Sequence, residues 1–86
     1  MKKNQVIHLQ LTTGWEIVGK VVKADEREVT LTDCARIYST GRFHQFSKGE
    51  LDSNSEVEPY TNDRTFLRDH IVEFGEWSGK VPLPVK

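Results

Sequence analysis

The sequence predicts an all-β fold built on a small, strongly bent antiparallel sheet. Between residues 6 and 37, apolar and polar residues alternate through three successive segments, which is the two-residue period of half-buried strands. Turn-forming residues separate these segments, and no part of the chain shows convincing helical periodicity. A glycine inside the second segment, Gly19, marks a strong bend or a close approach of two backbones. Together these features are typical of a meander that curls into a small barrel.

The first two expected strands flank a tight turn. Residues 7–12 carry an apolar residue at every second position, so one face of the strand is apolar and the other polar. Two threonines and Gly14 supply the turn, and alternation resumes over residues 15–22, with Gly19 and Trp15 on the same face. We expect Trp15 to pack in the core or at an interface, because a large aromatic beside a turn covers apolar area.

The third expected strand follows a polar hairpin at residues 23–28 and alternates from residue 29 to residue 37. One face of this strand is expected to carry Val29, Leu31, Asp33, Ala35 and Ile37. Strand character extends through Tyr38 and could continue over residues 42–46, although Gly41 interrupts it.

The rest of the chain completes a single domain over residues 1–86. Polar and turn-forming residues predict a long loop at about 46–63. Two short apolar segments, at residues 65–68 and 70–74, predict the fourth and fifth strands of the sheet. Prolines in the last segment, about 76–86, suit an extended tail or an edge segment and exclude a central strand.

Composition and charge narrow the classes of function. Twelve basic and thirteen acidic residues give a net charge of −1, which removes the long-range attraction of a general nucleic-acid binder, so any RNA contact must be local. The single cysteine, Cys34, excludes an intramolecular disulfide and a cysteine zinc cluster, and it fits a reducing compartment. There is no signal-like or membrane-spanning apolar run, so we expect a cytoplasmic protein without a membrane partner.

No pattern of residues indicates catalysis or a bound cofactor. Residues 14–21 contain two glycines and a lysine, as a phosphate-binding loop does, but Val21 cannot ligate magnesium and no helix follows. Asp52, Asn54 and Glu56 have the spacing that opens a calcium loop, but Val57 stands where that loop needs glycine, and a solvated acidic loop is the alternative. The three histidines have no metal-binding spacing, and a lone Cys34 on a strand is expected to be a small packed side chain. We therefore expect no enzyme activity, no metal and no cofactor.

Spaced residues in the first three strands resemble the first motif of the Sm and Sm-like (LSm/Hfq-type) protein family. They are the alternating apolar run, Gly14, Gly19, Asp25, Leu31, Asp33, Cys34 and Ala35. The segment 66–74 resembles the second motif, with Leu67 and Arg68 at matching positions and Asp69 where the family has glycine. This resemblance implies a strongly bent, five-stranded antiparallel Sm-like (SH3-like) barrel that assembles into rings.

In this family each subunit of a ring offers a base pocket made by the second hairpin loop and the loop after the fourth strand. A base is held there by stacking and by edge hydrogen bonds, and an arginine adds a planar cation. The resemblance assigns Arg68 to the arginine position with His70 beside it, and it places Arg27 and Glu28 in the hairpin loop. These four residues are the candidate RNA-binding site, although Glu28 would repel phosphate where the family usually has a neutral amide.

Arg68 and two aspartates of the first motif could instead have purely structural roles. Arg68 could instead form a salt bridge to Asp69, to Glu73 or to a neighbouring subunit. Asp25 and Asp33 are expected to hydrogen-bond turns and strand ends.

The resemblance also implies assembly through two strand edges. If residues 66–69 of one copy pair with residues 70–74 of the next, the contact is head-to-tail, and a closed rotation gives a homo-oligomeric ring of roughly five to seven copies. The candidate interface residues are Phe66, Leu67, Ile71, Val72 and Phe74. The expected function is binding of single-stranded RNA, in RNA processing, pairing or turnover. The alternative is a ring-forming scaffold with a degenerate RNA pocket that binds a protein partner through its long loop or its tail.

Overall fold

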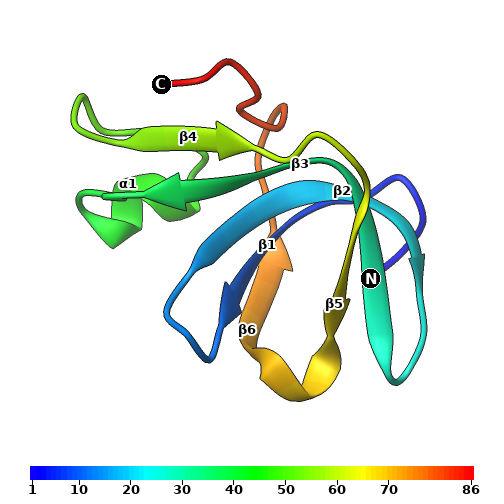
Figure 1. Cartoon of the computed structure of the whole chain (residues 1–86). Helices are drawn as coiled ribbons and strands as arrows, with labels where there is room; N and C mark the ends of the chain where they lie inside the picture. Colours follow the sequence, from blue (N-terminus) through cyan, green and yellow to red (C-terminus); the bar gives the residue numbers. More distant parts are fainter.

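The computed structural model describes residues 1–86 and consists mainly of antiparallel strands (Figure 1). The elements in chain order are β1 (Val6–Leu11), β2 (Glu16–Ala24), β3 (Glu28–Tyr38), α1 (Phe43–Ser47), β4 (Glu56–Pro59), β5 (Arg64–Leu67), the 3-10 turn η1 (Arg68–His70) and β6 (Ile71–Glu76). The prediction of an all-β antiparallel fold is confirmed.

The strands form one sheet in the order β4-β3-β2-β1-β6, and β5 pairs with the other half of β3. The long strand β3 therefore has two partners in succession, with Glu28 opposite Leu67 in β5 and Ala35 opposite Pro59 in β4. β6 pairs with β1, and β5 and β6 do not pair with each other, so the sheet is not closed. Figure 1 shows β5 and β6 joined by η1 at one end of the sheet.

The sheet has six strands instead of the expected five, because β4 forms inside the loop expected at about 46–63, and residues 60–63 separate it from β5. Residues 60–63 face a β-bulge in β3, where two residues, Asp33 and Cys34, lie opposite the single Gly19 of β2. A bulge leaves one residue unpaired and increases the local bend. Asp33 has a φ of +45° there, a conformation that favours residues with short polar side chains.

The bulge also changes which side of β3 each residue occupies. The expectation that Ala35 and Ile37 share a face with Leu31 is wrong. Cys34 instead packs with Leu31, whereas Ala35 and Ile37 lie in a separate apolar cluster. One extra residue in a strand with a period of two moves every later side chain to the opposite face.

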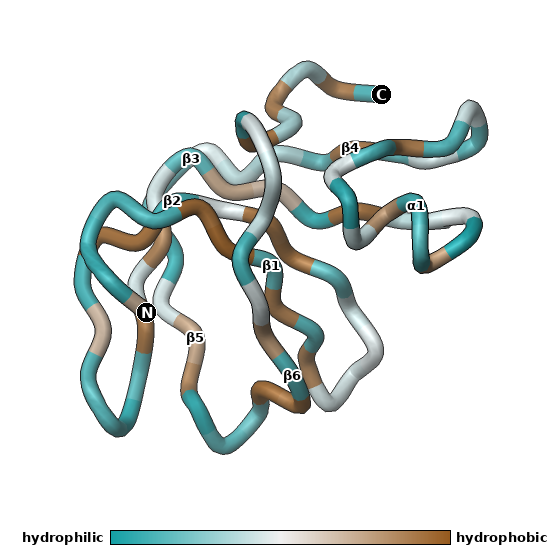
Figure 2. The backbone as a smooth tube through the Cα atoms, turned by 180° about the vertical axis from the view of Figure 1, so that it is seen from behind, coloured by the Kyte–Doolittle hydropathy of each residue, from teal (hydrophilic) through white to brown (hydrophobic).

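The sheet buries apolar residues on both faces. The first core consists of Ile7, Leu9, Ile17, Val21, Val29, Leu31 and Cys34. The second core consists of Val18, Ala35, Ile37, Phe46, Val57 and Trp77. In Figure 2 the apolar stretches follow the central strands, the β2–β3 hairpin loop is hydrophilic, and the β1–β2 turn is intermediate in hydropathy. Strands buried on both faces explain the apolar residues at consecutive positions in β2, such as Ile17 and Val18.

The segment after β3 forms a short helix where strand character could have continued. α1 buries Phe46 in the second core, and β4 adds Val57 to the same cluster, so structured elements interrupt the loop expected at about 46–63. One buried aromatic fixes this single helical turn, which is too short to show periodicity in the sequence. The structure contains no helix of the length and apolar character that a membrane crossing requires.

The tail packs across the same face. Trp77 is buried, and its main-chain N–H donates to the main-chain oxygen of Val6 over 2.9 Å. The last residues then run along the outer edge of β4, where Val57 and Lys86 exchange two main-chain hydrogen bonds of 2.9 and 3.2 Å. The proline-containing tail is thus an extended edge segment, as Figure 1 shows near the C-terminus.

Candidate nucleic-acid interface and strand edges

The β2–β3 hairpin is held by a single carboxylate. Oδ1 of Asp25 accepts the N–H groups of Arg27 over 2.8 Å and Glu28 over 2.9 Å, as expected for a turn aspartate. These two donors lower the pKa of Asp25 because they favour its charged form, and the nearby guanidinium of Arg68 adds to the effect. The hairpin therefore presents its side chains from a defined backbone.

The end of β5 lies against this hairpin. The N–H of Arg68 donates to the main-chain oxygen of Arg27 over 2.9 Å, and Leu67 lies opposite Glu28 in the strand register. Three of the four candidate RNA-binding residues, Arg27, Glu28 and Arg68, thus come together from segments distant in the sequence. Long-range strand pairing makes this juxtaposition.

The side chain of Arg68 is half-buried and forms no ion pair within the chain. The only ion pair in the structure joins His8 and Glu16, so the salt bridge from Arg68 to Asp69 or Glu73 is not formed. The Nε atom of Arg68 is buried without a hydrogen-bond partner. A buried donor without a partner is costly, and a ligand or a neighbouring chain that accepts from it would recover that cost.

The fourth candidate, His70, lies on the other side of η1. Its main-chain oxygen accepts the N–H of Thr12 over 2.8 Å, and its Nδ1 lies 3.5 Å from the hydroxyl of Thr12. His70 therefore contacts the β1–β2 turn and not the β2–β3 hairpin. Arg68 and His70 are the first and last residues of the three-residue turn η1, and their contacts lie on different hairpins.

The five candidate interface residues fall into two groups. Phe66 and Ile71 are half-buried and pack against the first core. Leu67, Val72 and Phe74 are 53%, 61% and 51% exposed, so β5 and β6, which follow each other in the chain, both present large apolar side chains to solvent.

Beside the exposed group is a hollow of about 310 Å³, most of whose lining is apolar. It is lined by Met1, Arg68, Ile71, Val72, Glu73 and Phe74. The hollow thus lies between the exposed residues of β6 and Arg68, one of the candidate RNA-binding residues.

The strands β5 and β6 each have one unpaired edge. β5 pairs only with β3, and β6 pairs only with β1. Arg64 begins the short strand β5 and Arg68 directly follows it, next to Asp63 and Asp69 outside the strand, whereas β6 itself carries Glu73 and Glu76. The two free edges thus carry opposite charges.

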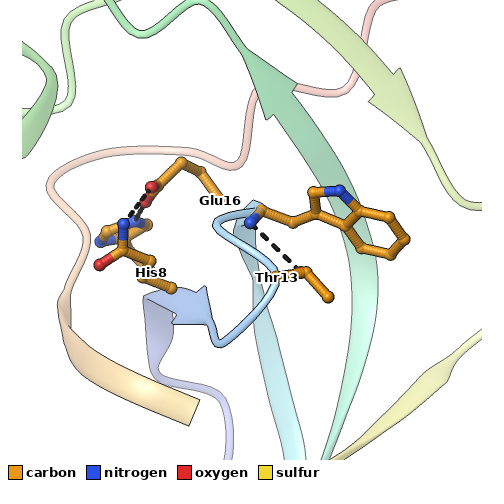
Figure 3. A network of polar contacts seen from close by, with 5 residues as sticks. His8, Thr13 and Glu16 are labelled. Atoms are coloured by element: carbon orange, nitrogen blue, oxygen red, sulfur yellow. Dashed lines mark hydrogen bonds and ion pairs between the residues drawn. The ribbon is translucent and has the colours of Figure 1, made fainter. Parts of the chain in front are cut away.

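A buried polar group that sequence reasoning missed joins β1 to β2. His8 Nε2 lies 2.5 Å from Oε1 of Glu16, and the amide of Gln10 donates to the other carboxylate oxygen over 3.0 Å. Figure 3 shows His8 and Glu16 facing each other across the hairpin. The ring of His8 also packs edge-on against Phe46, with centroids 5.1 Å apart. Alternation places His8 and Gln10 on one face, which is the signal that could have revealed this pair.

A second missed cluster surrounds Arg36. Its guanidinium lies 3.4 Å from the ring centroid of Trp15, and it donates to the hydroxyls of Tyr38 over 3.1 Å and Tyr60 over 2.9 Å. Trp15 is 41% exposed, so it serves as a stacking surface for an arginine and is not buried in either core. The cluster joins the end of the β1–β2 turn, β3 and the segment after β4.

Cys34 has no features of a nucleophile. Burial, followed by the nearby carboxylate of Asp63, raises the pKa of its thiol to about 11. At neutral pH the reactive thiolate is scarce, which agrees with a packed structural side chain. The structure contains no group of three or more His, Cys, Asp or Glu side chains that could hold a metal ion.

Comparison of the chain with protein-family models, with curated proteins and with solved structures finds no match.

Proposed function

We propose that this chain is an Sm-like subunit that assembles head-to-tail into a ring and binds single-stranded RNA beside the subunit contact. The observation that carries this proposal is the pair of unpaired, oppositely charged strand edges, β5 and β6, which carry exposed Leu67, Val72 and Phe74.

The edges favour pairing with another copy. An unpaired strand offers a row of main-chain donors and acceptors, and exposed apolar side chains add buried area when a second strand covers them. Because Arg64 begins β5 and Arg68 directly follows it, whereas β6 carries Glu73 and Glu76, pairing β5 with β6 joins unlike charges. Pairing either edge with itself would bring like charges together. The favoured contact is therefore heterologous, and a closed rotation gives a ring of roughly five to seven copies.

The RNA-binding part of the proposal rests on Arg68 and Arg27. Arg68 offers a half-buried guanidinium with an unpaired Nε donor, next to the arginine of the hairpin. A guanidinium can stack on a base and contact a phosphate at once, and repetition around a ring adds the weak sites together. Each subunit contributes few phosphate contacts, so binding should be moderate and should weaken with salt.

The second candidate is a ring-forming scaffold for a protein partner. It is favoured by the carboxylates of Asp25, Glu26 and Glu28, which crowd the same hairpin as Arg27 and repel phosphate. The two candidates share the ring and differ only in the ligand.

Assembly is tested by light scattering on the purified chain and on Val72→Glu. The wild type should have a mass several times that of one chain, and Val72→Glu should reduce it because a carboxylate would be buried in the contact. Val85→Glu is the matched control, since Val85 is 73% exposed but lies in the tail. A monomeric wild type would exclude the ring, and equal masses for the wild type and Val72→Glu would exclude this edge.

Ligand choice is tested by fluorescence anisotropy with labelled oligo-U and oligo-A at low and moderate salt. We expect micromolar or tighter binding that falls at least tenfold in Arg68→Ala, because each subunit of the ring loses a guanidinium. Arg42→Ala controls for loss of any exposed positive charge, since Arg42 precedes α1 and lies outside the hairpin. A ring that binds neither oligonucleotide at low salt would favour the scaffold.

A further inference from the structure

The ammonium group of Lys86, an exposed residue, hydrogen-bonds three main-chain oxygens of the β3–β4 connection. Its Nζ donates to the oxygens of Asp52 over 3.1 Å, Ser53 over 3.2 Å and Ser55 over 3.0 Å. We call these three oxygens the carbonyl cage. A lysine ammonium has three donors, so the cage satisfies all of them. A planar guanidinium has no single nitrogen with three N–H groups, so it could not donate to all three oxygens from one atom.

Hydrogen bonds inside the turn hold the cage in shape. The buried hydroxyl of Ser55 donates to the main-chain oxygen of Ser39 over 2.7 Å and accepts the N–H of Asp52 over 3.0 Å. The carboxylate of Asp52 accepts the N–H of Asn54 over 2.8 Å. The cage oxygens are therefore positioned by the fold, which lowers the entropic cost of holding an ammonium.

The same lysine joins the free edge of β4. The N–H of Val57 donates to the main-chain oxygen of Lys86 over 2.9 Å, and the N–H of Lys86 donates back over 3.2 Å. The next such pair along an antiparallel ladder would need an N–H from residue 84, and Pro84 has none. Val81 anchors the start of the tail by packing against the second core. The end of the tail is held by one main-chain pair and by the Lys86 ammonium, so the lysine carries a large share of the contact at that end.

The negative charge near the β4 edge also favours a positively charged ligand. Residues 50–58 include four carboxylates, those of Glu50, Asp52, Glu56 and Glu58, and no lysine or arginine. A segment that docks here through its backbone is favoured if it carries positive charge.

We propose that the outer edge of β4 and the carbonyl cage form a docking site for an extended, lysine-bearing segment of a partner protein, which the tail at residues 81–86 occupies in cis. The backbone pairs with Val57, and the lysine ammonium enters the cage. The partner gains access by displacing the tail, because both compete for the same hydrogen bonds. This site depends neither on ring assembly nor on RNA binding.

The cis contact is tested in the full chain by amide hydrogen exchange at Val57. Lys86→Met keeps the tail and its length but removes the ammonium, so exchange at Val57 should rise about tenfold. Lys80→Met is the matched control, since Lys80 directly precedes the docked residues 81–86 and its ammonium makes no hydrogen bond in the structure. Unchanged exchange at Val57 in Lys86→Met would overturn the proposal, because the ammonium would then not hold the tail.

The partner site is tested by titrating two peptides, VPLPVK and VPLPVM, into full-length Lys86→Met while following the amides of residues 52–57 by NMR. The lysine peptide should shift these amides and bind at least tenfold more tightly than its methionine counterpart. It should bind the wild type more weakly than Lys86→Met, because the tethered tail competes at an effective concentration of about a millimolar. Equal binding of both peptides, or no binding of either, would refute a lysine-selective site.

Discussion

Replacing Gly19 with alanine tests the close approach that bends the sheet. A Cβ at this position would lie 2.6 Å from the Cβ of Cys34 and 3.0 Å from Cδ1 of Leu31. Carbon atoms pack at about 3.5–4.0 Å, so the first contact is too short by about 1 Å. The atom of Cys34 is anchored directly to the backbone of β3 and cannot rotate away.

The expected cost follows from overpacking. Forcing one extra methyl group into a close-packed core costs about 1–3 kcal/mol, and the lower chain entropy of unfolded alanine returns less than about 1 kcal/mol of this. Gly19→Ala should therefore destabilise the chain by about 1–2 kcal/mol. For a domain of this size each kcal/mol lowers Tm by about 4–8 °C.

Urea unfolding at one fixed protein concentration measures this cost, with Gly75→Ala as the control. Gly75 also lies in a strand, and a Cβ there would meet no atom within 4 Å. Gly75→Ala should leave the free energy of unfolding unchanged or slightly higher. If Gly19→Ala and Gly75→Ala have equal stability, β2 and β3 can separate at little cost and the reasoning from the short contact fails.

Two further predictions follow from the pKa shifts of Cys34 and Asp25. The thiol of Cys34 should react slowly with maleimide at pH 8, because burial raises its pKa to about 11, and denaturant should accelerate the reaction; fast labelling of the folded chain would contradict its burial. For Asp25 the folded pKa is lower than the unfolded value of 3.8, so its contribution to stability is complete above that pH and is lost as the pH falls through the folded pKa. Asp25→Asn should therefore be less stable than the wild type at pH 7 in urea, and the difference should shrink on acidification. A difference that stays constant down to pH 3 would show that ionisation of Asp25 does not stabilise the hairpin.

The resemblance to the Sm-like family predicted the positions of some candidate site residues and not of others. It placed Arg27, Glu28 and Arg68 in two loops, and pairing of β3 with β5 brings those loops together. It also placed His70 beside Arg68, but η1 directs His70 to the β1–β2 turn. Residue patterns locate the ends of such short turns poorly, so the direction of His70 could not be predicted from the sequence.

The clusters around Arg36 and Lys86 could not be predicted from the sequence for a different reason. Arg36 reads as an ordinary polar residue in an alternating strand, and only the folded sheet brings Trp15 and Tyr60 around it. Lys86 reads as a charged end of a proline-containing tail, and only the turn at residues 52–55 supplies its carbonyl cage. Contacts between residues tens of positions apart leave no local pattern in the sequence.

By itself the sequence determined the all-β class, the first three strands, the close approach at Gly19 and the turn role of Asp25. Each of these depends on neighbours within a few positions, where side-chain period and turn chemistry act directly. Tertiary structure alone decided the change of face after Asp33, the burial of Phe46 and the opposite charges on the two free edges. These features arise when strands distant in the chain choose partners and register, and that choice minimises the free energy of the whole sheet, not that of any one segment.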